Sequence, residues 1–419
     1  MKRTIRPAGA KRRGSITGIG ARFGFTKPAT GAGRCALTFT IFCALSLVAV
    51  RPMLAQTETV LYNFKGGSDG QNPYSRLTPD GEGNFYGTTV NGGDFGSGTV
   101  FELSPNGAGG WNETVLYSFT GGADGGNPWF SGVIFDSKGN LYGTTFDGGD
   151  GGIGVVFELS PEGTSWTESV LHVFPGGPDG AAPVNGLAMD QAGNLYGTTY
   201  EGGTQGDGVV FEISQSDDNW TEQVIYEGAD TGWGGVVVDS EGNVFFGTPS
   251  SVFELSPSGG GWISKTIANF NPGWKDGGPA DTPVLDQAGN IYGTTTGGYS
   301  LGTVYKLSRG NNGKWKKKVI HHFTGGRRGD NPWPSVVVDA SGNIYGTTIA
   351  GGKSGNGIVY ELVAPVGTVG YKEKILCSFD GINGSQPWGS LILDSAGNLY
   401  GTTDVGGTSN AGVAFVVTP

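Results

Sequence analysis

The chain has 419 residues, with 26 Lys or Arg against 37 Asp or Glu and a formal net charge of −11. Ten of the basic residues lie within residues 1–55, so the rest of the chain carries 16 basic against 37 acidic residues, a net charge near −21. Such a chain has no basic stripe that could neutralise phosphates, and we expect it to bind neither nucleic acid nor an anionic membrane surface.

Residues 1–55 contain no Asp or Glu, and the apolar run 35–50 near their end is short for a membrane span. The pattern predicts a secretory signal peptide cleaved after Ala55, which leaves no transmembrane span in the mature chain and places it in the periplasm, at the cell surface or outside the cell. Because the basic region is unusually long, a mis-assigned start codon and a retained membrane anchor stay open. Two of the three cysteines leave with this segment, so Cys377 has no partner for an internal disulfide.

A motif close to Gly-Asn-Leu-Tyr-Gly-Thr-Thr recurs seven times after the signal, at steps of 47 to 56 residues. A period near fifty that is built from short β-type runs is typical of a β-propeller or another radial array. The copies begin at Gly83, Gly139, Gly193, Gly242, Gly289, Gly342 and Gly397.

Each unit contains four runs rich in Val, Ile, Leu, Phe and Tyr, separated by Gly, Asp, Asn and Pro. In the second unit these runs are 113–119, 129–136, 139–145 and 154–160. Four strands in each of seven units predict an all-β, seven-bladed propeller with 28 strands, which forms a single domain over residues 56–419.

The order of strands within a blade follows from the apolar character of the runs. The most apolar run, such as 236–239, suits the innermost strand, and the run that follows a Trp suits the outermost. The mature chain opens with an outermost-type run and closes on a third-strand run. We therefore expect residues 58–64 to pair with residues 412–418, which closes the ring and removes its exposed edges.

An Asp-x-x-Gly-Asn turn precedes every central motif. The favoured interpretation is a hairpin in which Asp bonds backbone amides and Gly takes a left-handed conformation. A calcium loop is the alternative, although each turn offers only one carboxylate and calcium requires six or more oxygens. We therefore expect no metal site and no cofactor. The leading residues are Asp80, Asp136, Asp190, Asp239, Asp286, Asp339 and Asp394.

The loop from the outermost to the next innermost strand shares one rim of the disc with the loop between the second and third strands. It repeats Asp-Gly-x-x-Pro, and an aromatic residue follows the proline or lies near it. Aromatic faces beside carboxylates suit sugar recognition, because ring faces stack on CH groups while carboxylates bind hydroxyls. The candidate ligand-binding residues are Asp69, Tyr74, Asp124, Trp129, Asp179, Trp233, Trp274, Trp333 and Trp388.

A structural interpretation of the same aromatic residues is favoured, because a repeated residue more often maintains the fold. Each ring would then cap an inner strand and pack on its neighbour. The tryptophans that start outer strands are assigned to packing between blades. The fourth unit lacks the Asp-Gly-x-x-Pro loop and shortens its second loop to residues 249–251, which predicts a notch in the rim or reflects decay of the repeat.

No catalytic residues are expected. His172 and His321 fill a strand position held elsewhere by tyrosine, so the chain has almost no material for a triad or a zinc site. The alternative is a polysaccharide lyase or hydrolase that uses rim carboxylates such as Asp124, Asp179 or Asp207. It requires a carboxylate pair at working distance with one raised pKa.

The unit GNLYGTTxxGG…GTVFELSP, preceded by D-G-x-x-P and W-x-x-x-V-L-Y-x-F, resembles the GloVer tandem-repeat family of bacterial exported proteins over about residues 57–419. Members end in different surface-attachment signals, whereas this chain stops at Pro419 directly after an expected strand. The resemblance implies export and a repeat scaffold, with no reaction to carry over. A looser similarity to NHL and kelch propellers supports the strand order. The leading hypothesis is a secreted, monomeric, non-catalytic module that binds glycan or another extracellular ligand; a purely structural surface protein is a further alternative.

Overall fold

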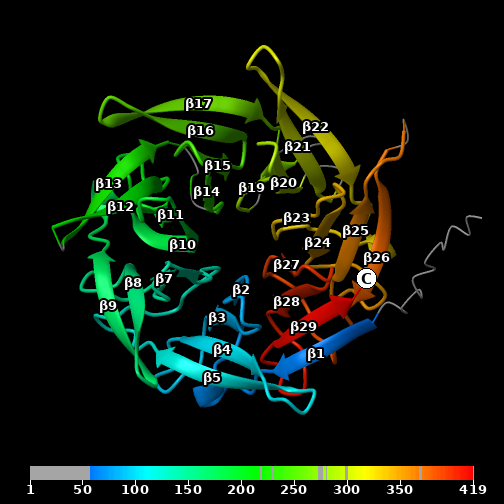
Figure 1. Ribbon diagram of the computed structural model, residues 1–419, viewed down its shortest axis with the longest axis horizontal. Coiled ribbons are helices and arrows are strands. Elements are labelled where there is room, and N and C mark those ends of the chain that lie inside the picture. The colour runs from blue at the N-terminus through cyan, green and yellow to red at the C-terminus, as the bar shows by residue number, and fades with distance from the viewer. Residues whose placement is uncertain are drawn as a thin grey trace, which may run out of the picture. The chain divides into compact units, whose positions relative to one another are not determined.

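The computed structural model describes residues 57–217, 219–228, 231, 233–271, 277–279, 281–297, 301–367 and 370–418. Their strands form seven separate antiparallel sheets, which stand as blades around a central axis (Figure 1). The expected seven-bladed propeller is therefore confirmed. The described part of the chain has no helix with the length and apolar character needed to cross a membrane. The expected signal segment, residues 1–55, lies outside the described residues.

Blades are numbered in chain order, and each runs from its inner to its outer strand. Blade 1 is β2 (Thr78–Pro79), β3 (Phe85–Thr89), β4 (Thr99–Pro105) and β5 (Trp111–Ser118); blade 2 is β6 (Ile134–Phe135), β7 (Leu141–Thr145), β8 (Val155–Glu162) and β9 (Ser165–Val173). Blade 3 is β10 (Ala181–Met189), β11 (Leu195–Glu201), β12 (Val209–Ser216) and β13 (Asn219–Glu227); blade 4 is β14 (Val236–Val238), β15 (Val244–Thr248), β16 (Ser251–Ser258) and β17 (Gly261–Asn269).

The remaining three blades follow the same order. Blade 5 is β18 (Gly278–Pro279) with β19 (Val284–Leu285), then β20 (Ile291–Thr296), β21 (Thr303–Arg309) and β22 (Trp315–His322); blade 6 is β23 (Val337–Val338), β24 (Ile344–Thr348), β25 (Ile358–Val363) and β26 (Lys372–Ser378). Blade 7 is β27 (Ile392–Leu393), β28 (Leu399–Thr403), β29 (Val413–Thr418) and β1 (Thr57–Asn63). Short 3-10 turns lie at η1 (Gly67–Asp69), η2 (Gly177–Asp179) and η3 (Gly326–Arg328). The inner strand of blade 5 is interrupted, so the described residues hold 29 strands where 28 were predicted.

Ring closure has the predicted form. Strand β1, from the start of the folded domain, pairs with β29 at its end, with Val60 opposite Phe415 and Tyr62 opposite Ala414 (Figure 1). Blade 7 therefore contains both ends of the domain. Because every blade has a blade on either side, the ring leaves no terminal blade exposed.

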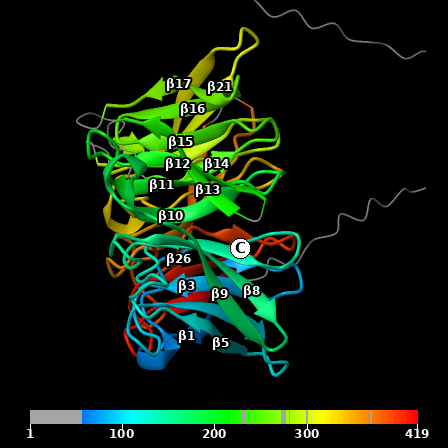
Figure 2. The ribbon, with the colours of Figure 1, turned by 90° about the vertical axis from the view of Figure 1, so that its left-hand side faces the viewer.

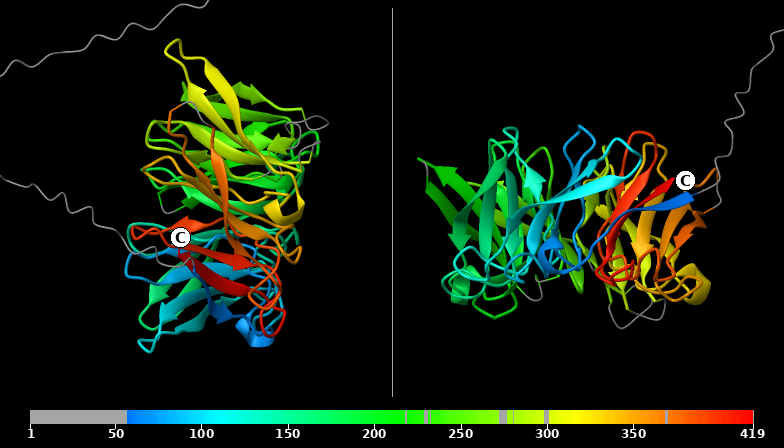
Figure 3. Two further views of the ribbon diagram at one scale, coloured as in Figure 1. Left: turned by 90° about the vertical axis from the view of Figure 1, so that its right-hand side faces the viewer. Right: turned by 90° about the horizontal axis from the view of Figure 1, so that it is seen from below.

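The two rims also have the predicted loops, and the side views in Figures 2 and 3 show them at opposite faces of the disc. The loop from outer to inner strand is bonded to the loop between the second and third strands, as in the backbone bond from Gln71 N to Asn91 O at 2.8 Å. We call this face the loop rim. The opposite face carries the Asp-x-x-Gly-Asn turns and is called the turn rim.

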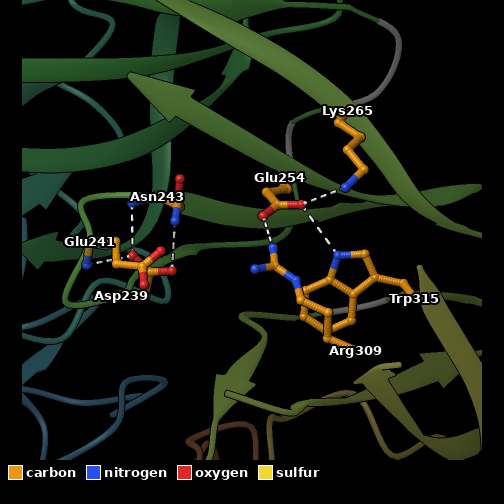
Figure 4. A network of polar contacts seen from close by, with 7 residues as sticks. All are labelled: Asp239, Glu241, Asn243, Glu254, Lys265, Arg309 and Trp315. Atoms are coloured by element: carbon orange, nitrogen blue, oxygen red, sulfur yellow. Dashed lines mark hydrogen bonds and ion pairs between the residues drawn. The ribbon is translucent and has the colours of Figure 1, made fainter. Parts of the chain in front are cut away.

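The hydrogen bonds within each Asp-x-x-Gly-Asn turn explain why the turn begins with Asp. In the blade 4 turn, Asp239 accepts bonds from the amides of Glu241 and Asn243 at 2.9 Å each, and from the Asn243 side chain at 2.9 Å (Figure 4). The other six turns repeat this pattern. These carboxylates therefore have structural partners within their own turns.

The glycine of the Tyr-Gly-Thr-Thr motif makes room for an aromatic ring on the next strand. A Cβ atom at Gly143 would lie 2.5 Å from Cζ of Phe157, and one at Gly197 would lie 2.4 Å from Cζ of Phe211. The rings are fully buried. Blade 4 is the exception, because Phe246 fills this position and stacks on Phe253 at a centroid distance of 5.2 Å.

The first threonine of the motif joins neighbouring blades. Its hydroxyl donates to a backbone carbonyl oxygen in the next blade's inner strand, or in the residues that lead into that strand, at 2.6–3.3 Å in six blades; blade 4 has Gly247 at this position. The pairs are Thr88–Ser131, Thr144–Asn185, Thr198–Gly234, Thr294–Trp333, Thr347–Pro387 and Thr402–Ser75.

Outer-strand tryptophans pack between blades, as predicted for their position. Trp166 lies 6.4 Å from Tyr86 of the preceding blade, measured between ring centroids. Trp220, Trp262 and Trp315 make the same contact with Tyr142, Tyr196 and Phe245.

The interface of blades 4 and 5 adds charged groups. The side chain of Glu254 is buried and accepts bonds from Arg309, from Trp315 Nε1 at 3.2 Å and from Lys265 Nζ at 3.3 Å (Figure 4). The Arg309 guanidinium also lies over the Trp315 ring, 4.9 Å from its centroid.

Candidate ligand-binding site

One position recurs at the loop rim, six residues before the Asp of each Asp-x-x-Gly-Asn turn. From this residue the chain runs along the inner edge of the blade towards the turn rim. This position is aromatic in five of the seven units, and blade 2 carries a further ring at the preceding residue. We call these six residues the aromatic cluster: Tyr74, Trp129, Phe130, Trp233, Trp333 and Trp388. All six side chains are half-buried, so each keeps some exposed surface.

The six rings pack against one another in a closed circuit. Centroid distances are 5.3 Å for Tyr74–Phe130, 5.7 Å for Phe130–Trp129 and 6.4 Å for Trp129–Trp233. They are 5.9 Å for Trp233–Trp333, 5.6 Å for Trp333–Trp388 and 5.9 Å for Trp388–Tyr74. Rings of blades 2, 4 and 6 contact one another directly, although blades 3 and 5 separate these blades around the ring. The cluster therefore spans the channel mouth at the loop rim.

Polar groups fix Tyr74 beside the cluster. Its hydroxyl donates to Asp404 Oδ2 at 3.1 Å, and Asn72 Nδ2 donates to Asp404 Oδ1 at 2.8 Å. Asp404 lies in the second loop of blade 7 and is 5% exposed. Burial raises the pKa of Asp404, and these two hydrogen bonds partly oppose that rise. A chain of amides continues to Asn91, whose Nδ2 donates to Asn72 Oδ1 at 3.1 Å.

Backbone contacts hold Trp233 and Trp333. Asn185 Nδ2 of blade 3 donates to the carbonyl oxygen of Trp233 at 2.6 Å, and Thr294 Oγ1 donates to that of Trp333 at 3.3 Å. Phe130 has a φ of 55°, a left-handed conformation that costs energy for a bulky residue. This conformation accommodates the extra residue of blade 2, where Trp129 and Phe130 stack side by side.

A cavity of about 470 Å³ lies in the channel below the cluster. At one end it is lined by Tyr74, Phe130 and Trp388, and at the other by residues that directly precede the turns, including Pro79 and Leu285. The cavity therefore reaches from the inner side of the cluster towards the turn rim. Inner strands of all seven blades contribute to its wall.

Two charged residues, Arg76 and Asp281, line this cavity. Asp281 accepts bonds from the Thr282 amide at 2.6 Å, the Ser335 amide at 2.7 Å and Ser390 Oγ at 3.1 Å. Burial raises the pKa of Asp281, although these hydrogen bonds act in the opposite direction. Three blades therefore hold one carboxylate in a fixed position in the channel.

The predicted rim aspartates lie away from the cluster. Asp69 accepts a bond from Tyr62 Oη at 2.5 Å, and Asp124 accepts bonds from Tyr117 Oη at 2.9 Å and from Thr120. The tyrosines belong to outer strands, so these aspartates lie at the outer end of the loop. Asp179 occupies the same place in η2. The structure brings Tyr74, Trp129, Trp233, Trp333 and Trp388 together without these three aspartates; Trp274 lies outside the described residues.

Each of these aspartates is coupled to a glutamate on the outer strand of the next blade. Burial, followed by the charge of Asp69, raises the pKa of Glu113 to about 8. The same causes raise the pKa of Glu168, beside Asp124, and of Glu222, beside Asp179, to about 7 in each case.

The pair of Asp69 and Glu113 lines a hollow of about 570 Å³ on the outer side of the ring. In each pair one carboxyl group has a raised pKa, which is one of the two conditions set for an enzyme; the other is a working distance between the carboxylates. Their recurrence at three successive blade interfaces favours a structural role. Among the described residues, no three His, Cys, Asp or Glu side chains are grouped so that they could hold a metal ion.

Sequence reasoning missed Phe130, Asp404, Arg76 and Asp281. Counting backwards from the Asp of each turn would have found three of them, because Phe130 lies at the aromatic position six residues before it. The position four residues before that Asp holds Arg76, whereas the other six units have Gly, Ser or Thr there. The position five residues before it holds Asp281, and the other six units have uncharged residues.

Comparison with known families identifies the repeat. The model of the Gloeobacter/Verrucomicrobia repeat matches residues 47–251 and 236–419. The chain belongs to this repeat family. No curated protein shows detectable sequence similarity to it.

Solved structures similar to this Gloeobacter/Verrucomicrobia repeat protein support the fold alone. Virginiamycin B lyase from Staphylococcus aureus aligns with a TM-score of 0.54 at 13% identity, covering 87% of this chain and 99% of the lyase. A protein from Lactobacillus plantarum aligns with a TM-score of 0.51 at 14% identity, covering 80% and 99%. An extracellular domain from B. thetaiotaomicron aligns with a TM-score of 0.54 at 11% identity, covering 85% of this chain and 40% of that one.

Proposed function

We propose that this repeat propeller is an exported, non-catalytic module that binds a glycan against the aromatic cluster. The observation that carries the proposal is the convergence of six half-buried rings from five blades at one mouth of the channel. Aromatic faces stack on the CH groups of sugar rings, and several rings in one patch would contact more than one sugar unit.

Polar groups beside the rings add partners for hydroxyl groups. The half-buried amides of Asn72 and Asn91 lie next to Tyr74, and Asn127 precedes Trp129 by two residues. They replace the rim aspartates as the expected hydrogen-bonding groups, because Asp69 and Asp124 lie at the outer end of the loop, away from the rings. The basic, acid-free leader and the extracellular domain among the structural neighbours support export.

A glycan array tests the proposal. Residues 56–419 are compared with single variants Trp129→Ala, Trp333→Ala and Trp388→Ala, and with Phe95→Ala as a control. Phe95 is 63% exposed, lies on the same rim and is outside the cluster. We expect glycan binding that the three cluster variants weaken and the control retains. Absence of binding to any glycan, or binding that the cluster variants leave unchanged, contradicts the proposal.

The coupled carboxylates keep an enzyme as the second candidate. A lyase or hydrolase at the Asp69–Glu113 pair would lose its activity in a Glu113→Gln variant, and products released from polysaccharide substrates would measure this loss. We expect no such products from either protein.

A further inference from the structure

Arg76 differs from the residues at its repeat position. The other six units place Gly, Ser or Thr there, and their blades form the same inner strand. An arginine is therefore not needed to build the blade. A long cation directed into a channel costs desolvation energy, so its presence requires another explanation.

The environment of Arg76 leaves its donors free. Its side chain is exposed to the channel cavity, and within the described residues it makes no hydrogen bond and no ion pair within 4.0 Å. Enclosure by the blades lowers the pKa of Arg76, whereas the negative charge of Asp281 opposes this effect. Arginine keeps its proton at neutral pH even so, and its five N–H donors remain available.

A second donor in the wall of the cavity also lacks a partner. Trp388 lines the cavity, and its indole Nε1 is buried with no hydrogen-bond acceptor among the described residues. Buried donors are nearly always satisfied in folded proteins. The buried Trp388 Nε1 and the solvent-exposed Arg76 guanidinium therefore offer donors in one wall to a ligand that brings acceptors.

We propose that the channel cavity binds a small organic acid whose carboxylate is held by Arg76. A planar guanidinium binds a carboxylate through two parallel hydrogen bonds. The body of the acid would lie against half-buried apolar side chains of five neighbouring inner strands and the inner face of the cluster. These side chains are Ile134, Ala188, Val237, Leu285, Val337 and Phe130.

The fixed carboxylate of Asp281 limits the negative charge that a ligand in this cavity can carry. Arg76 and Asp281 together carry no net charge, so a dianion in the cavity would be repelled by Asp281. A monocarboxylate suits the pair better than inorganic phosphate. The cavity lies on the inner side of the cluster, so the acid and the glycan would contact opposite sides of Tyr74, Phe130 and Trp388. The acid site does not depend on glycan binding.

Isothermal titration of residues 56–419 with benzoate tests the site, with galacturonate, benzamide and inorganic phosphate as comparison probes. Benzamide keeps the shape of benzoate without its charge, and galacturonate replaces the apolar body by a hydroxylated one. The main variant is Arg76→Ser, which introduces the residue type that Ser335 and Ser390 place in blades 6 and 7. Arg327→Gln is the matched control, because Arg327 is exposed and lies on the outer side of blade 6 in η3.

We expect benzoate to bind the parent protein and the control equally, and Arg76→Ser about tenfold or more weakly, as loss of a charged hydrogen-bonding partner produces. Benzamide and phosphate should bind at least tenfold more weakly than benzoate. If galacturonate binds more tightly than benzoate, the ligand does not have the proposed apolar body. If phosphate binds as tightly as benzoate, the site does not select a singly charged carboxylate. The site itself is contradicted if benzoate does not bind, or binds equally well to Arg76→Ser. A circular dichroism spectrum and unfolding midpoint like the parent's establish that Arg76→Ser is folded.

Discussion

The hydroxyl of Thr402 lies 2.9 Å from the backbone carbonyl oxygen of Ser75, although 327 residues separate them in the chain. Thr402 belongs to the last blade, and Ser75 leads into the inner strand of the first. Five other blade interfaces contain the same bond, so the closing interface is built like those inside the chain. The ring is therefore closed both by strand pairing and by this threonine hydrogen bond between blades.

Removing this hydroxyl should weaken closure. We expect Thr402→Val to lower the free energy of unfolding by about 1–2 kcal/mol, because the Ser75 carbonyl loses its donor in a buried site. Thr402→Ser keeps the hydroxyl and should retain most of the stability. Urea unfolding measures both variants, and equal stability of Thr402→Val and the parent contradicts a role for the bond.

The glycine beneath each aromatic ring should be sensitive to one added methyl group. We expect Gly143→Ala to destabilise the fold by about 1–3 kcal/mol, because its Cβ would overlap the Phe157 ring. Combining it with Phe157→Leu should cost less than the sum of the two single changes, since the smaller side chain relieves the overlap. Additive costs in chemical denaturation would show that the ring and the glycine do not interact.

The charged group between blades 4 and 5 should contribute measurably to stability. Arg309→Ala leaves buried Glu254 with two donors, and we expect a loss of about 1–3 kcal/mol, moderated because the Arg309 side chain is 45% exposed. Lys265→Ala should cost under about 1 kcal/mol, because that lysine is 54% exposed. Thermal unfolding measures both, and a larger loss for Lys265→Ala than for Arg309→Ala contradicts this assignment.

The contribution of Glu113 to stability should fall as the pH rises from about 4.5 to about 8. The pKa of Glu113 is about 8 in the folded protein against an ordinary value of 4.5, so the folded state holds the proton more tightly. The stability it contributes is complete below pH 4.5 and is lost as the pH rises through 8. Glu168 and Glu222, with pKa values of about 7, act in the same direction.

The variant Glu113→Gln tests this dependence. It should match the parent at pH 4.5 and exceed its stability at pH 8, because the amide stays neutral. Glu241→Gln, an exposed residue in the blade 4 turn, is the control and should follow the parent at each pH (Figure 4). Denaturant midpoints between pH 4 and 9 measure all three. A parent that becomes more stable over this range, together with an unchanged Glu113→Gln, contradicts the assignment.

The sequence predicted the scaffold because repetition supplies seven observations of each feature. The period, the four runs and the unmatched terminal runs sufficed to predict the blades and the pairing of β1 with β29. The rim position of Trp233 and Trp333 was predicted from their matching places in the repeat, whereas the contact between their rings was found only in the structure. The notch expected at blade 4 stays a prediction, although the short connection is confirmed by the pairing of Thr248 with Ser251.

The details of the site depended on contacts that the repeat pattern does not encode. Asp69 and Asp124 turn to outer-strand tyrosines because the loop folds back on the strand that precedes it, and a consensus string does not show this direction. Phe130 was hidden because one inserted residue shifts blade 2 relative to the proline. Arg76 could have been found in the sequence as the one charged residue at its position in the seven repeats. Only the structure, however, places Asp281 in the same cavity.

The indole N–H signals of the tryptophans test the glycan proposal most directly. With [15N]tryptophan in residues 56–419, the best-binding array glycan is titrated while heteronuclear spectra follow each signal. We predict shifts for Trp129, Trp233, Trp333 and Trp388 and none for the outer-strand residues Trp111, Trp166, Trp220, Trp262 and Trp315. Shifts confined to the outer-strand residues, or a bound glycan that moves no cluster signal, would contradict the assignment of the channel mouth as the binding site.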